Sequence, residues 1–142
     1  MRLYETDDFY PLGVLFKACG LEVKPEEKPE GIVKMWRVDD EDGELIAAAT
    51  AQVLNGIYVA KHLAVTEACR GKYIGKKLLN LIEEELIGRG AKEMWLAGKV
   101  PEYYIKFGWE TVPAEEAPPF SKCLVCKQFN NGCYPSIMRK RV

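Results

Sequence analysis

The 142-residue sequence lacks any apolar run approaching the roughly 20 residues that a membrane-spanning helix needs. It also lacks an excess of charge of either sign, because its formal net charge is only -1. A protein without a basic field has little means of neutralising phosphates, so we expect no nucleic-acid partner. The sequence therefore favours a soluble protein that acts neither in a membrane nor on nucleic acid.

Histidine is also scarce, since His62 is the only one, and the cysteine count of five is odd. The first residues contain one arginine followed by acidic residues rather than an apolar run, so they do not resemble a secretory signal. An odd number of cysteines without such a signal argues against a disulfide framework and for reduced thiols, a metal site or plain packing. We therefore expect a cytoplasmic protein.

Three of the cysteines, Cys123, Cys126 and Cys133, follow the pattern C-x2-C-x6-C. The first pair has the spacing of a zinc site, but a structural zinc needs four ligands and no second C-x2-C or histidine pair exists. We predict no metal here, and expect unliganded thiols near the substrate pocket. Zinc at these three cysteines and a redox pair formed by Cys123 and Cys126 are the alternatives.

The chain length suits one domain, which we assign to residues 1–142. Hydrophobic periodicity predicts the element order β-α-β-β-β-α-β-α-β, with Asn55-Gly56 as a tight turn between two antiparallel strands. Asp7 or Asp8 is the expected cap of the first helix. Residues 113–142 form a Cys-rich C-terminal segment that is either decoration on the domain or its closing edge, and only SIMRKRV in this segment is expected to form a last strand.

The segment Leu63–Leu86, LAVTEACRGKYIGKKLLNLIEEEL, is the most informative part of the sequence. Its lysines precede its glutamates along the predicted helix, which is the reverse of the order that the helix dipole favours. No Ser, Thr, Asp or Asn stands between Cys69 and Tyr73 to cap the first backbone N–H groups. A phosphate can take the place of the missing cap, although an ordinary loop with solvated lysines fits the charges equally well.

Arg70-Gly71-Lys72-Tyr73-Ile74-Gly75, which follows the strand LAV, resembles the signature R/Q-x-x-G-x-G/A of the GNAT superfamily of N-acetyltransferases. PEYYIKFGWE resembles the Y-x-K-x-G-F/W element of the same family, with Tyr104, Lys106, Gly108 and Trp109 in register. The resemblance covers residues 1–112. It implies an α/β (α+β) fold: a mixed, mostly antiparallel sheet of about six or seven strands with helices on both faces.

The resemblance also implies a binding site for acetyl coenzyme A. The backbone of Leu63 and Val65 would contact the pantetheine arm, and an amide there would steady the oxyanion of the tetrahedral intermediate. The pyrophosphate would lie on the turn formed by Arg70, Gly71, Lys72, Tyr73, Ile74, Gly75 and Lys76. Tyr73 stands where the family has glycine: the turn tolerates it if Tyr73 keeps right-handed backbone angles, and a narrower turn would weaken cofactor binding.

Tyr104 matches the general acid of the family, which protonates the departing thiolate of coenzyme A, and Tyr103 is expected to be a packing aromatic. The general base is not evident. His62 lies on the cofactor strand, but strict alternation places it on the face opposite Val59 and Lys61, where the bases of the family lie, so we favour a structural or surface role for it. Glu67 and Glu102 have no better support, and a chain of water molecules is the remaining alternative.

The predicted function is the transfer of an acetyl group from acetyl coenzyme A to a primary amine, by direct attack within a ternary complex. The acceptor is a small-molecule or peptide amine that the sequence does not identify. Homodimers are common in the family that the sequence resembles, so a homodimer is the oligomeric state that the resemblance implies. The alternative is a non-catalytic module with the same fold, which either binds acyl coenzyme A or senses metal or redox state through its cysteines.

Overall fold

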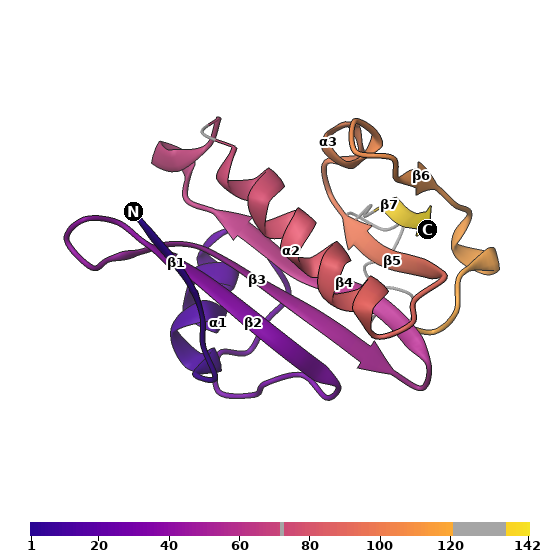
Figure 1. The fold of residues 1–142 in the computed structure, drawn as a ribbon, viewed down its shortest axis with the longest axis horizontal. Helices are drawn as coiled ribbons and strands as arrows, with labels where there is room; N and C mark the ends of the chain where they lie inside the picture. The colour runs from indigo at the N-terminus through magenta and orange to yellow at the C-terminus, as the bar shows by residue number, and fades with distance from the viewer. Residues whose placement is uncertain (72, 121–135) are drawn as a thin grey trace.

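The computed structural model describes residues 1–71, 73–120 and 136–142, which form a seven-stranded sheet in the order β1-β2-β3-β4-β5-β7-β6 (Figure 1). All neighbouring strands are antiparallel except β4 and β5, which are parallel. This mixed sheet confirms the predicted fold class. The strands are β1 (Arg2–Glu5), β2 (Ile32–Asp39), β3 (Leu45–Leu54), β4 (Ile57–Val65), β5 (Glu93–Gly98), β6 (Glu110–Thr111) and β7 (Ser136–Arg141).

Helices cover both faces of the sheet, as predicted (Figure 1). α1 (Phe9–Ala18) packs on one face, and α2 (Ile74–Gly88) and α3 (Pro101–Ile105) pack on the other. The central strand β3 is rich in buried alanines, whose small side chains let helices approach it from both sides. The alanines of the α2 face belong to the largest core cluster, whereas Ala48 belongs to the cluster beneath α1.

The turn between β3 and β4 is the predicted tight turn, since Asn55 has φ 53° and Gly56 has φ 77°. Further along β4 the pairing is interrupted, because His62 pairs with Thr50 while Ala60 pairs with Ala51. Lys61 is therefore an extra residue, a β-bulge, and it reverses the alternation of side chains beyond it. The prediction from strict alternation was wrong: His62 lies on the same face as Val59, not opposite it.

The last strand, β7, lies between β5 and β6, so β6 forms the edge of the sheet. The last strand predicted in SIMRKRV is confirmed by β7, but the expectation that this tail is decoration or the closing edge was wrong for Ser136–Arg141. Six residue pairs join β5 to β7, from Glu93 with Arg141 to Gly98 with Ser136. β5 and β7 thus build a second half of the sheet beside the β1–β4 half.

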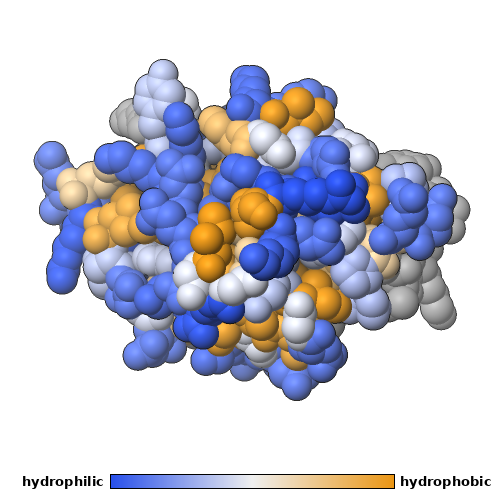
Figure 2. Space-filling model, turned by 45° about the vertical axis from the view of Figure 1, so that its right-hand side comes forward, coloured by the Kyte–Doolittle hydropathy of each residue, from blue (hydrophilic) through white to orange (hydrophobic). Residues whose placement is uncertain are grey.

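The first helix begins after Asp8, as expected, but the carboxylate of Asp8 makes no capping hydrogen bond. None of the helices in the part of the chain that the structure describes is long and apolar enough to cross a membrane. The face drawn in Figure 2 carries its hydrophobic residues in small groups separated by hydrophilic ones.

Candidate active site

Four elements meet where β4 and β5 end. Gly75, in the first turn of α2, lies against both α3 and β4: a Cβ at this position would be 2.6 Å from the Tyr103 hydroxyl and 3.7 Å from Cγ2 of Val65. Gly98, the last residue of β5, lies against Tyr104, because a Cβ there would be 2.9 Å from a ring carbon. The two glycines therefore allow α3 to rest on the ends of α2 and β5.

Near the end of β4, some backbone N–H and C=O groups are left unpaired by the neighbouring strands that the structure describes. The Thr66 N–H donates to the Ile46 carbonyl across the β3–β4 pair at 2.9 Å, so alternate residues of β4 form the hydrogen-bonded pairs with β3. Leu63 and Val65 occupy the positions between these hydrogen-bonded residues, so their N–H and C=O groups are directed away from β3. Among the described residues β5 pairs with β4 only at Val59 and Trp95, so β5 does not use these groups.

The turn between β4 and α2 leaves the helix end open. The helix begins after Tyr73, and no side chain of the described residues caps its first N–H groups. Arg70 folds back to β4, where its Nε donates to the Val65 carbonyl at 3.1 Å. Gly71 has φ 86°, in the left-handed region that favours glycine. Lys72 lies outside the described residues, so its predicted cofactor contact stays a prediction.

Tyr73 differs from what the sequence indicated. Its backbone is left-handed, with φ 61° and ψ 11°, so it does not keep the right-handed angles under which the turn was expected to tolerate a tyrosine. The residue thus adopts the kind of conformation for which the family signature has glycine, at a cost of about 1 kcal/mol. The residue is 74% exposed, so its side chain does not fill the turn.

Tyr104 is partly buried in the core cluster beneath α2, edge-on to the rings of Tyr103 and Trp109. Burial, with a smaller contribution from Tyr103, raises the pKa of Tyr104 to about 12. The phenol consequently keeps its proton throughout the neutral range. Burial also raises the pKa of Tyr103, whose hydroxyl lies against the first turn of α2.

His62 lies on the other face of the sheet, under α1. Its ring stacks on Phe16, with the centroids 4.6 Å apart, and its Nδ1 lies 2.7 Å from the Thr50 hydroxyl oxygen. Burial, followed by the charge of Lys61, lowers the pKa of His62 to about 3. An imidazole in this environment is a poor proton acceptor for catalysis, which supports its structural role. Glu67 and Glu102 are exposed.

Phe107 is a site residue that the sequence analysis passed over. Its ring lies edge-on to Tyr103, and the Lys76 ammonium lies 5.6 Å from its centroid, so it joins the first turn of α2 to the end of α3. The sequence feature that could have identified Phe107 is its position between Lys106 and Gly108, which the Y-x-K-x-G-F/W element leaves unspecified.

No group of three or more potential metal ligands occurs in residues 1–71, 73–120 and 136–142. Cys123, Cys126 and Cys133 lie outside these ranges, so the predictions about their thiols are not addressed. A cavity of about 320 Å³ does occur among the described residues, but it lies at the other end of β4 and β5, beside Ile57, Tyr58, Lys92 and Glu93.

A sheet in which two strands separate beside an uncapped helix is what the resemblance to acetyltransferases implied, and comparison with known families agrees. The model of the acetyltransferase (GNAT) family matches residues 3–109. The chain therefore belongs to the GNAT acetyltransferase family, and the acetyl coenzyme A cofactor predicted from the sequence is the one that this family uses. A search of curated proteins finds no match.

Solved structures with low sequence identity share the fold. N-acetylglutamate synthase from Neisseria gonorrhoeae, complexed with coenzyme A and N-acetyl-glutamate, is 17% identical with a TM-score of 0.76, over 99% of this chain and 35% of that one. The chain thus spans about a third of that enzyme. Rv2747 from Mycobacterium tuberculosis, in complex with CoA and NLQ, is 13% identical with a TM-score of 0.75, over 100% and 99%. A GNAT-family acetyltransferase from Staphylococcus aureus Mu50 is 13% identical with a TM-score of 0.72, over 99% and 98%.

Proposed function

We propose that this chain is a single-domain, cytoplasmic N-acetyltransferase that transfers the acetyl group of acetyl coenzyme A to a primary amine by direct attack. The observation that carries the proposal is the meeting of three features at one place. These are the uncapped first turn of α2, the outward-directed backbone of Leu63 and Val65, and a protonated Tyr104 on α3.

Acetyl coenzyme A supplies an activated acyl group as a thioester. The open N–H groups of Tyr73, Ile74, Gly75 and Lys76, at the positive end of the helix dipole, would hold its pyrophosphate. Lys76 and Arg70 add positive charge nearby, and Lys72 is proposed to do the same. Leu63 and Val65 would pair with the pantetheine amides as a neighbouring strand would, and one of their N–H groups would stabilise the oxyanion.

Tyr104 would donate its proton to the thiolate of coenzyme A as the carbon–sulfur bond breaks. A phenol with a pKa of about 12 is a weaker acid than the thiol that it would protonate, so a complete transfer from the ground state is uphill. A hydrogen bond that strengthens as charge develops on sulfur is still effective. The proton released by the attacking amine would leave through water, because His62 is buried under α1.

Calorimetric titration with acetyl coenzyme A tests the cofactor site. We expect micromolar binding that Gly75→Glu weakens strongly, because a side chain at this position displaces the Tyr103 hydroxyl and adds a carboxylate to the phosphate site. Gly88→Glu is the matched control: it adds the same charge to the same helix, where a Cβ meets nothing within 4 Å. Equal weakening by both variants, or no binding by the unmodified protein, would contradict the proposed site.

Screening of amine acceptors then separates the enzyme from the alternative. Acetyl transfer to any amine, lost when Tyr104 is replaced by Phe, supports the enzyme. Binding of acetyl coenzyme A without transfer to small-molecule or peptide amines supports a non-catalytic module with the same fold.

A further inference from the structure

Glu83 is a buried carboxylate on the side of α2 that faces α3 and β7. Only 8% of the residue is exposed, although it lies among three consecutive glutamates. Its Oε1 accepts a hydrogen bond from the Lys140 ammonium of β7 at 2.5 Å, and its Oε2 lies 3.4 Å from the indole Nε1 of Trp109. This carboxylate thus links α2 with the last strand and with the segment that follows α3.

Lys140 extends the link to the end of α3. Its ammonium also donates to the Phe107 carbonyl at 2.8 Å. The backbone N–H groups of Phe107 and Trp109 both donate to the Tyr104 carbonyl, at 2.9 Å and 3.2 Å. The turn after α3 is therefore held from both sides, by Tyr104 through its backbone and by Lys140 through its ammonium. Gly108, with φ 92°, leaves room for the Lys140 side chain to cross this turn.

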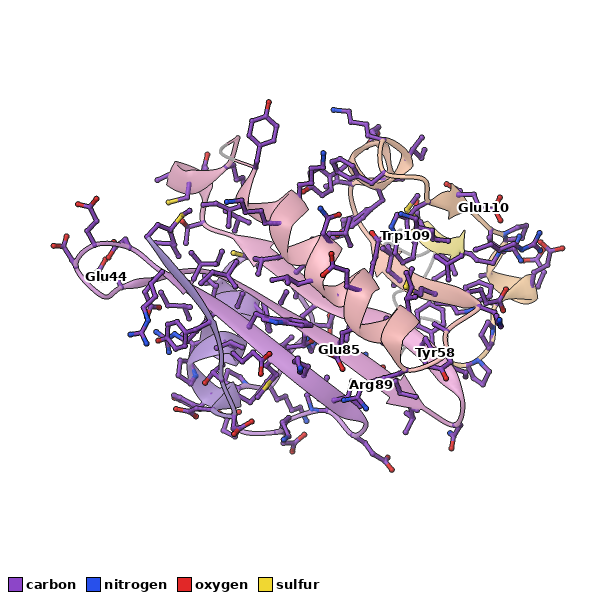
Figure 3. All side chains as sticks on the ribbon, viewed as in Figure 1. Glu44, Tyr58, Glu85, Arg89, Trp109 and Glu110 are labelled. Atoms are coloured by element: carbon purple, nitrogen blue, oxygen red, sulfur yellow. The ribbon has the colours of Figure 1, made fainter. Side chains whose placement is uncertain are left out.

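A second ion pair of α2 provides a comparison. Glu85 pairs with Lys34 of β2 at 2.9 Å and with Arg89 at 2.7 Å. Figure 3 shows Glu85 and Arg89 on one side of α2 and Trp109 on the other. Lys34 and Lys140 have similar side-chain exposures of 29% and 24%, but of these two lysines it is Lys140 that donates a hydrogen bond to the turn after α3, at the Phe107 carbonyl.

We propose that Glu83 and Lys140 are positioning residues that hold α3 so that the Tyr104 hydroxyl stays at the site where the thiolate departs. This inference rests on the proposed role of Tyr104. A partly buried ion pair adds little net stability, because desolvation offsets the attraction between the charges. Its geometry, however, fixes three elements relative to one another, and catalysis is sensitive to displacements of about 1 Å.

Hydrolysis of acetyl coenzyme A in the absence of amine provides a readout that needs no identified acceptor. We expect Lys140→Met to lower its turnover roughly 10-fold while the KM for acetyl coenzyme A changes less than about 2-fold. Lys34→Met should change neither. Because Lys140→Met leaves a buried carboxylate unpaired, the double variant Glu83→Leu/Lys140→Met is measured as well. It should fold with a Tm near that of the unmodified protein and show the same loss of turnover.

A double-mutant cycle distinguishes positioning from a general structural role. If Lys140 acts through Tyr104, Lys140→Met should change turnover less than about 2-fold in a Tyr104→Phe background. A second readout is the ¹³C resonance of the Tyr104 ring, assigned by its absence in Tyr104→Phe. Its chemical shift, which reports the surroundings of the ring, should change in Lys140→Met and stay unchanged in Lys34→Met.

Equal losses of turnover from Lys140→Met in both backgrounds would overturn the inference, as would a normal turnover of Lys140→Met when Tyr104→Phe is defective. These outcomes leave the proposed function intact. If Tyr104→Phe itself hydrolyses acetyl coenzyme A normally, the proposed role of Tyr104 fails and the inference fails with it.

Discussion

His62 and Tyr104 are both kept neutral by burial, but they lie on opposite faces of the sheet and have different neighbours. His62 is enclosed by Phe16, Phe9 and the Thr50 hydroxyl. Tyr104 lies at the end of β5, and its hydroxyl has no hydrogen-bond partner among the described residues. Burial shifts both pKa values away from neutrality, so a shifted pKa alone does not identify a functional group. The position at the strand ends, beside an open helix terminus, distinguishes Tyr104 from His62.

The sharpest test of this contrast is removal of the Tyr104 hydroxyl. Tyr104→Phe should lower the turnover of acetyl transfer about 100-fold, the usual contribution of a general acid, because the thiolate must then leave unprotonated. The affinity for acetyl coenzyme A, measured by calorimetry, should change less than about 2-fold. Tyr103→Phe is the control, since its hydroxyl lies against α2. An equal loss of turnover in both variants would assign no special role to Tyr104.

His62→Ala should affect stability and not chemistry. Loss of the stacked ring and of its contact with Thr50 should lower the free energy of unfolding by about 2 kcal/mol, measured by urea denaturation. Thr50→Val should cost about 1 kcal/mol, because it leaves Nδ1 without its partner. Turnover per folded molecule should stay the same in both. A strong loss of turnover in His62→Ala at full stability would indicate that His62 is the general base.

The two groups should respond to opposite extremes of pH. The folded-state pKa of His62 is about 3, below its ordinary value of 6.5. The unfolded chain therefore binds a proton that the folded protein does not, and stability should fall by about 1.4 kcal/mol per pH unit as pH drops below 6.5. The raised pKa of Tyr104 acts in the other direction: its contribution is present below pH 10 and is lost as pH rises toward 12. His62→Gln should remove the acid dependence only, as urea denaturation from pH 4 to 8 would test.

The smallest effect concerns Tyr73, in the turn that precedes α2. Tyr73→Gly should raise the free energy of unfolding by about 0.5 kcal/mol, because relief of the left-handed strain outweighs the added freedom of the unfolded chain. Asn55→Gly is the matched control, with φ 53° in the hairpin turn. It should give no gain, since asparagine tolerates this conformation. Destabilisation by Tyr73→Gly would mean that the tyrosine side chain contributes more than its exposure indicates.

Local patterns gave the elements of this fold because each pattern has its own physical cause. The apolar residues from Ile74 to Leu86 recur at helical spacing, and the helix begins and ends where the glycines and the missing cap suggest. Asn55-Gly56 accepts positive φ angles, so the hairpin was predictable from two residues. Tyr104 came from a family resemblance and not from any local pattern.

The features that the sequence did not predict depend on contacts between distant residues. A bulge at Lys61 leaves no trace in composition, yet it moved His62 to the other face. The order β5-β7-β6 depends on which later strand pairs with the free edge of β5, and the sequence of β5 alone does not determine that pairing. Glutamates near the C-terminal end of α2 interact unfavourably with the helix dipole. Tertiary contacts explain their position, because Glu83 pairs with a lysine of β7 and Glu85 pairs with a lysine of β2.

The insertion of β7 between β5 and β6 has a consequence for synthesis of the protein. During translation, β1 to β4 can pair as soon as they leave the ribosome, since each is adjacent in the chain to its neighbour in the sheet. β5 must wait for residues 136–141 before its second edge is covered. Until then a nascent chain exposes an unpaired strand edge, which is the kind of surface that chaperones bind and that promotes aggregation.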